Sequence, residues 1–224
     1  MGIIVVGVLI ALGAEQVVEW VHRNDLQREA RETIGDEIRQ NLDSFRRRSE
    51  VQQCIDRRLG EIEGFILARQ SLTALPRPLW VGRPQVWTVT DSRWNAATSG
   101  ARTALLSASQ QAEYGDVYDG LKTFDGAQAI EQLAWAHLRV LETLPSIDPI
   151  SRSNLVQALH EARYANFRIK VAAVQAQERA HTAGLLSGHS PYSEGSRSVC
   201  IPMNTARDVA LRMTIRHGAV IAEP

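Results

Sequence analysis

The chain has few of the residues that usually carry metal or redox chemistry. Of its 224 residues, two are cysteine, Cys54 and Cys200, and six are histidine. The spacing of the cysteines excludes a CxxC redox pair, and two thiols alone do not make a zinc site. No two histidines lie three or four residues apart, so no pair can bind a metal from one helical face. The sequence therefore predicts neither a metal nor a cofactor.

Motifs of the common hydrolytic and nucleotide-binding folds are also missing. The nearest match to the G-x-S-x-G nucleophile elbow is the stretch 188–192, which ends in tyrosine instead of glycine. Neither type of glycine-rich phosphate loop occurs. Helix capping and surface charge explain the carboxylates near mid-chain, which are Glu113, Asp116, Asp119 and Asp125. We therefore expect no catalytic activity. An unrecognised hydrolase would need a serine or cysteine within hydrogen-bond reach of a histidine in a cleft.

An excess of charge of either sign is absent as well. The 25 basic residues balance 25 acidic ones, and only Lys122 and Lys170 among the basic residues are lysines. Because a nucleic-acid-binding domain would show a basic face, we expect no nucleic-acid partner. The densest basic run, Arg46 to Arg48, lies between Asp43 and Glu50. We interpret this run as a solvated helix face.

What the chain does have is an uncharged N-terminal run from Ile3 to Ala14. Crossing a bilayer takes about 20 apolar residues, a length reached only by extending the run to Val21 through Glu15, Gln16 and Glu19. Trp20 suits an interfacial position near the end of such a span. We predict a transmembrane anchor over residues 1–21. A cleaved signal peptide, favoured by small residues at 11 and 13, and a buried core helix remain open alternatives.

One side of this anchor is made of small residues. Gly7, Ala11 and Ala14 lie at helical spacing, which permits close contact with another helix in the bilayer. The expected partners are therefore the lipid bilayer and either a second copy of the chain or another membrane protein. Three arginines follow the span at positions 23, 28 and 31, and taken alone they favour a cytoplasmic domain; a basic segment upstream would reverse this orientation.

Cys54 and Cys200 allow a disulfide. In an exported domain the two thiols could be bonded to each other, and in the cytosol they would more often stay free. The sequence alone leaves both states open.

Beyond the anchor, apolar residues recur every three or four positions without strand-like alternation, which is typical of amphipathic helices. The first helix is expected to run from about residue 2 to 70. A proline-rich connector over residues 73–86 follows it. Further helices are expected over 87–100 or 90–100 with Asp91 as a plausible cap, and over 107–121 with Ser107 and Ser109 as candidate caps. The next is expected from 123 or 125 to Pro145. Another should start with Asp148 as its cap and Pro149 in its first turn and end near 183, and the last should run from 204 or 205 to 218.

These elements predict an all-α protein in which the transmembrane helix continues into a long stalk helix that packs with an antiparallel helical bundle. The anchor would occupy residues 1–21, the stalk residues 22–72 and the helical domain residues 73–224. A short strand pair between Trp80–Val81 and residues 199–201 is the one β feature that the pattern permits.

Aromatic residues offer the only candidate pocket. Trp87 and Trp94 are seven residues apart and could share one face of a helix, close to Tyr114 and Tyr118. Core packing is the simpler explanation, but the same four residues could line the pocket of a small-molecule sensor. Trp94 is expected to be largely buried against the first helix and the 107–121 helix. Gly100 is expected to end its helix or to allow a close backbone approach.

The N-terminal stretch VVGVLIAL, followed by Glu15, Gln16 and Trp20, resembles bacterial single-pass membrane proteins of unknown function. Their helical domain contains a tryptophan-then-glycine helix, matched here by the stretch from Trp94 to Gly100. The resemblance implies an inner-membrane location and a helical fold, but no activity. We therefore expect a membrane-tethered interaction or assembly domain without catalysis, with its soluble part on the periplasmic side. The alternative is a helical small-molecule sensor.

Overall fold

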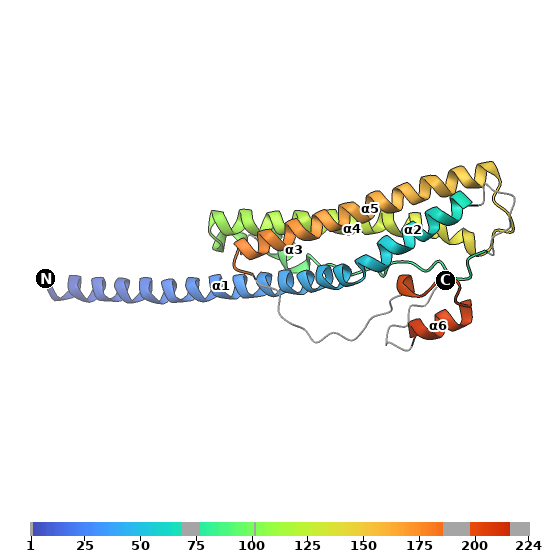
Figure 1. Ribbon diagram of the computed structural model, residues 1–224. Coiled ribbons are helices and arrows are strands. Elements are labelled where there is room, and N and C mark those ends of the chain that lie inside the picture. The colour runs from blue at the N-terminus through green and yellow to red at the C-terminus, as the bar shows by residue number, and fades with distance from the viewer. Residues whose placement is uncertain (1, 69–76, 101, 186–197, 216–224) are drawn as a thin grey trace.

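The computed structural model describes residues 2–68, 77–100, 102–185 and 198–215, with the backbone alone for residues 2–12 and 215 (Figure 1). Within these residues it contains six α-helices and three short 3-10 helices. The predicted all-α class is therefore confirmed at this level. No helix in the described part of the chain holds a stretch long and apolar enough to cross a bilayer.

The first predicted helix is present as two helices in succession. Helix α1 spans Gly2–Glu50 and α2 spans Gln52–Ala68, with the break at Val51. The amide of Ile55 donates to the carbonyl oxygen of Val51 at 3.1 Å, so helical hydrogen bonding resumes at once. Figure 1 shows α2 leaving α1 at an angle. The prediction of one uninterrupted helix was wrong in this respect.

Helix α3 (Ser92–Ser99) and the 3-10 helix η1 (Arg102–Leu105) lead into the long helix α4 (Ala108–Leu138). Ser107 caps α4 and forms a reciprocal capping box with Gln110, as its sequence position predicts. The predicted break near residue 122 was wrong. Thr123 donates its hydroxyl to the carbonyl of Asp119 instead of capping a new helix, and apolar residues on both sides of it stay buried.

After the 3-10 helix η2 (Arg139–Glu142), helix α5 (Pro149–Thr182) returns antiparallel to α4 (Figure 1). Asp148 caps α5 by accepting the amides of Ile150 and Ser151, and Pro149 occupies the first turn, as predicted. The two helices approach closely because small residues line their contact. A Cβ atom added to Gly120 would lie 3.2 Å from the Cβ of Ala176.

The C-terminal part comprises the 3-10 helix η3 (Ser198–Cys200) and helix α6 (Arg207–Ile215). Helix α6 starts later than predicted, and its predicted end lies outside the described residues. The expected strand pair is not formed among the residues that the structure describes. The two segments nevertheless meet, because the amides of Leu79 and Trp80 both donate to the carbonyl of Met203.

Two large apolar clusters make up most of the core, and a small third one joins Trp80 to Ile201 and Ala210. One joins the second half of α1 to α4 and α5 and includes Ile38, Phe45 and Phe124. The other joins α2 to the opposite ends of α4 and α5 and includes Ile62 and Trp135. The predicted stalk is thus part of the bundle from Ala30 onward, because Ala30 already packs against the first cluster, and α1 before it projects beyond the bundle (Figure 1).

Candidate functional site

The connector, here residues 77–91, is extended and is held by side chains of the helices beside it. Asn41 of α1 donates to the carbonyl of Thr90 at 2.7 Å and accepts its amide at 2.8 Å. Gln128 of α4 accepts the amide of Trp87 at 2.8 Å and donates to its carbonyl at 2.9 Å. Each side-chain amide thus replaces the pair of bonds that a neighbouring β-strand would make. The connector therefore lies fixed between α1 and α4 without a strand partner.

This arrangement separates the predicted aromatic pair. Trp87 is buried on the connector, whereas Trp94 lies on α3, so the expectation that they share one helix face was wrong. Trp94 is half-buried rather than largely buried, and its ring stacks on Tyr118 with centroids 5.1 Å apart and planes inclined by 11°. Tyr114 is buried on α4 beside them. Contact between Trp94 and Tyr118 leaves no room for a ligand between their rings.

Glu37 of α1, which sequence reasoning missed, binds groups of both α3 and α4 beside these aromatic rings. Its carboxylate accepts the hydroxyl of Tyr118 at 2.7 Å, the hydroxyl of Ser92 at 3.0 Å and the amides of Arg93 and Trp94 at 3.0 and 3.2 Å. Glu37 thereby caps α3 from another helix. Burial, together with hydrogen bonding to this carboxylate, raises the pKa of Tyr118 far above its ordinary value.

Asp91, the predicted cap of α3, occupies the N-cap position but makes no capping hydrogen bond with its side chain. Gly100 ends the helix as expected, and its amide donates to the carbonyls of Ala96 and Thr98. A Cβ atom at Gly100 would lie 3.1 Å from the Ala96 carbonyl oxygen, so the close backbone approach is real.

A second buried polar cluster surrounds Arg48, which is only 2 % exposed. Its guanidinium donates at 2.8 Å to both the Glu131 carboxylate and the Asn166 side-chain oxygen, and at 3.1 Å to Gln52. Burial lowers the pKa of Arg48 and raises that of Glu131, while the attraction between the two charges acts in the opposite direction on both. The interpretation of residues 46–48 as a solvated face was therefore wrong for Arg48.

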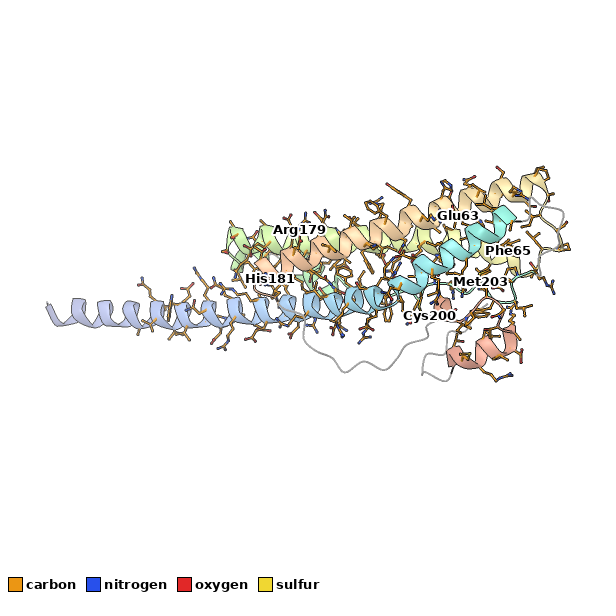
Figure 2. The ribbon with its side chains drawn as sticks, in the orientation of Figure 1. Glu63, Phe65, Arg179, His181, Cys200 and Met203 are labelled. Carbon is orange, nitrogen blue, oxygen red and sulfur yellow. A yellow bond between two sulfur atoms is a disulfide. The ribbon has the colours of Figure 1, made fainter. Side chains whose placement is uncertain are left out.

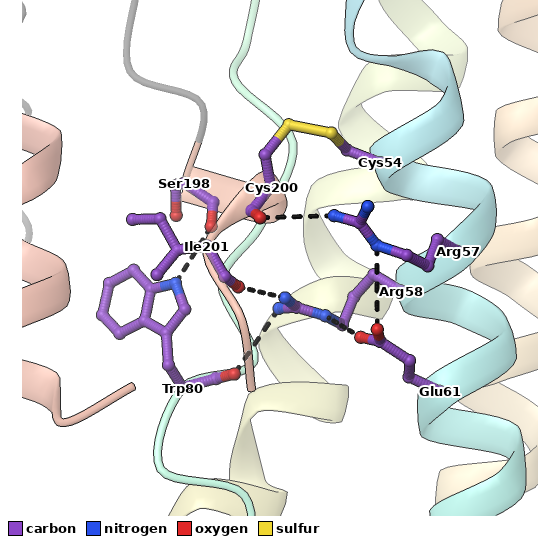
Figure 3. Close-up of a disulfide and its surroundings, with 8 residues drawn as sticks. All are labelled: Cys54, Arg57, Arg58, Glu61, Trp80, Ser198, Cys200 and Ile201. Atoms are coloured by element: carbon purple, nitrogen blue, oxygen red, sulfur yellow. Dashed lines mark hydrogen bonds and ion pairs between the residues drawn. A yellow bond between two sulfur atoms is a disulfide. The ribbon is translucent and has the colours of Figure 1, made fainter. Parts of the chain in front are cut away.

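Cys54 and Cys200 are joined by a disulfide that ties η3 to α2 (Figure 3). Beside it, the fully buried Arg58 donates to the carbonyls of Val81 and Ile201 and, at 2.8 Å, to Glu61. The indole of Trp80 donates to the carbonyl of Ser198 at 2.9 Å (Figure 3). The connector, α2 and the C-terminal segment are thus fastened together by one covalent bond and several polar ones.

In the part of the chain that the structure describes, one cleft brings together side chains of catalytic types, and its hydroxyl group is already engaged. A cleft of about 350 Å³ between the end of α4 and the start of α5 contains His137, Ser151 and Glu161. The hydroxyl of Ser151, however, donates to the Asp148 carboxylate at 2.6 Å as part of the α5 cap. Among the described residues, no group of three or more potential metal ligands comes together.

The most unusual surface is the projecting segment, residues 13–26 of α1, in which every residue is exposed. It includes Val17, Val18, Trp20 and Val21, with Trp20 65 % exposed. Ala14 is exposed as well, while the exposure of Gly7 and Ala11 lies outside what the structure describes. Apolar side chains in such a row indicate a surface that a membrane or a partner covers.

Where the projecting segment reaches the bundle, a groove opens between α1, α3 and η1. It has a volume of about 630 Å³, and apolar side chains form most of its wall, including Leu26, Ala30 and Leu105. Arg93 and Arg102 lie at the same groove. We call this the root groove. Gly100 also lines it, whereas Trp87 lines a separate polar groove beside α1.

The chain matches no family model, no curated protein and no solved structure. The resemblance of its N-terminus to single-pass membrane proteins therefore stays a prediction.

Proposed function

We propose that the protein is a membrane-tethered helical domain that serves interaction or assembly and has no catalytic activity. The observation that carries this proposal is the projecting segment. Its exposed valines and Trp20 continue the uncharged run from Ile3 to Ala14 on one unbroken helix, so burying them in lipid would extend the apolar contact to Val21. Trp20 would then lie near the headgroups.

The disulfide supports a periplasmic position for the bundle, because such bonds persist mainly in oxidising compartments. Helix pairing in the inner membrane would use Gly7, Ala11 and Ala14, with a second copy or another membrane protein as the partner. The interior polar groups favour the structural function over sensing. Glu37, Arg48 and Asn41 bind groups of the chain itself.

Carbonate extraction of bacterial membranes tests the tether. The full chain should remain in the pellet at high pH, and the variant Leu9→Arg/Leu12→Arg should move into the supernatant. Each arginine at the centre of a span costs about 2.5–3.5 kcal/mol of insertion free energy. Ile150→Arg is the matched control: Ile150 is 75 % exposed on α5, and its replacement should leave the chain in the pellet.

Recovery of the intact parent chain in the supernatant would refute the tether. A product that lacks residues 1–13 would identify the N-terminus as a cleaved signal peptide instead.

A further inference from the structure

The root groove combines apolar walls with exposed cationic groups. Arg93 donates to the carbonyl of Thr33 at 3.0 Å, which holds its exposed guanidinium beside the groove. Arg102 is exposed and makes no ion pair or hydrogen bond with the described residues. Glu29 is the only acidic residue of the lining, so the groove carries a net positive charge. Its chemistry suits an anion that is attached to an apolar chain.

The position of the groove is set by the length of helix that precedes it. Leu26 lies five residues after Val21, and at 1.5 Å per residue this corresponds to about 7.5 Å along α1. The polar layer of a bilayer is about 5–7 Å deep on each side. If residues 3–21 are embedded as proposed, Leu26 at the mouth of the root groove lies at the outer edge of the headgroup layer. Thr33, whose carbonyl Arg93 binds, lies about 18 Å from Val21, so a lipid would rise partly out of the bilayer to reach the arginines.

Other parts of the bundle agree with this placement. Figure 2 shows Arg179 and His181, near the end of α5, at the end of the bundle from which α1 projects, while Glu63 and Phe65 lie toward the other end. Arg179 donates to the carbonyl of Asp116 at 2.8 Å, which places the start of α4 at the same end. This end of the bundle would therefore face the membrane surface.

We propose that the root groove binds an anionic phospholipid, with Arg93 and Arg102 on the phosphate group and the apolar wall against the beginning of an acyl chain. This inference rests on the proposed tether. A volume of about 630 Å³ lies within the range of sites for small molecules, roughly 300–1,000 Å³. A helix of a partner protein would need a longer apolar stripe than this short groove provides.

Lipid retention by the full chain in a mild detergent tests the proposal. Native mass spectrometry would count the adducts formed with dioctanoyl phosphatidylglycerol and with dioctanoyl phosphatidylcholine. The anionic lipid should be retained preferentially. Arg93→Gln/Arg102→Gln should weaken its binding about 30-fold, since each basic residue near an anionic lipid contributes a factor of about five.

Two further variants separate the groove from general surface charge. Arg77→Gln/Arg207→Gln removes two exposed arginines elsewhere and should leave retention unchanged. Ala96→Phe fills the groove without changing its charge, and it should abolish retention of the anionic lipid. Each variant is compared only after its circular dichroism and melting temperature have been shown to match the parent.

Equal retention of the two lipids, or unchanged retention by Arg93→Gln/Arg102→Gln or by Ala96→Phe, would overturn the proposal. Displacement of the lipid by millimolar inorganic phosphate alone would also overturn it, because the site would then recognise a free anion. The tether is read out separately: a chain that carbonate releases but that still retains the lipid in detergent would refute the tether and keep the groove as a lipid site.

Discussion

The two halves of helix α1 differ in which side chains are exposed and which are buried. The projecting segment exposes Val18 and Trp20, whereas the half within the bundle buries Glu37, Asn41 and Arg48. Each buried polar group is matched by partners from the connector, α3, α4 or α5. The exposed apolar groups are matched by nothing within the described chain. The second half therefore packs within the molecule, whereas the first half is the part that the proposed tether would use.

Removing the buried ion pair in the second half of α1 should have the largest effect on the unfolding free energy. Arg48→Met leaves the buried Glu131 without its cation and should cost about 3–5 kcal/mol of unfolding free energy. Urea denaturation of the full chain in detergent, followed by circular dichroism, measures this loss. Arg28→Met is the control, because the ion pair of Arg28 with Asp25 is exposed and contributes at most about 1 kcal/mol.

The loss of unfolding free energy in Arg48→Met should depend on pH. Burial raises the pKa of Glu131, and removing Arg48 removes the attraction that lowers it. Stability from such a group is fully present below its unfolded-state pKa, about 4.3, and is lost as the pH rises through the higher folded-state pKa. The deficit of Arg48→Met should therefore shrink as the pH falls from 7 toward 4. A variant as stable as Arg28→Met at neutral pH would show that the buried pair does not hold the helices together.

Removing the disulfide should have the next largest effect on the unfolding free energy. The disulfide joins residues 146 positions apart, and the variant Cys54→Ser/Cys200→Ser should lose about 2–4 kcal/mol of unfolding free energy. Alkylation of the parent chain without reductant should label neither cysteine, and after denaturation and reduction it should label both. Labelling of both thiols without reductant would contradict the bond and weaken the periplasmic assignment.

The smallest effects on the unfolding free energy are expected for two tryptophans, one in the bundle and one in the projecting segment. Trp94→Ala removes a half-buried ring that stacks on Tyr118 and should cost about 2 kcal/mol, less than a fully buried tryptophan would. Trp20→Ala, in the projecting segment, should change the unfolding free energy by no more than about 0.5 kcal/mol.

A Trp94→Ala variant that melts with its parent would argue against the structural role of the ring and favour a ligand-binding one. Thermal unfolding of both variants and the parent in the same detergent provides the comparison.

Local sequence rules predicted the helices well where the signals are local. Asp148 and Pro149 mark the start of α5, and Ser107 marks the start of α4, because capping depends only on residues a few positions apart. Thr123 misled the prediction of α4, since a residue that can cap a helix can equally donate to the preceding turn.

The internal polar contacts could not be predicted, because they join residues far apart in the chain. The seven-residue spacing of Trp87 and Trp94 suggested one helix, but the bonds of Gln128 and Asn41 hold the connector in an extended form. The sequence did contain one signal of these buried contacts. Glu37 and Arg48 lie at positions that continue the apolar stripe of α1, and a charged residue in such a stripe usually has a specific buried partner.

Because α1 is one continuous helix, a tilt at its N-terminal end also displaces its C-terminal end. From Val21 to Glu50 it extends about 43 Å, and the polar contacts of its second half join it to the bundle. Membrane helices tilt by about 20° on average, and a tilt of this size would carry Glu50 sideways by about 15 Å. With the N-terminal residues embedded as proposed, a change of one helical turn in their depth or packing would therefore alter how far the bundle reaches over the membrane and which neighbours it meets.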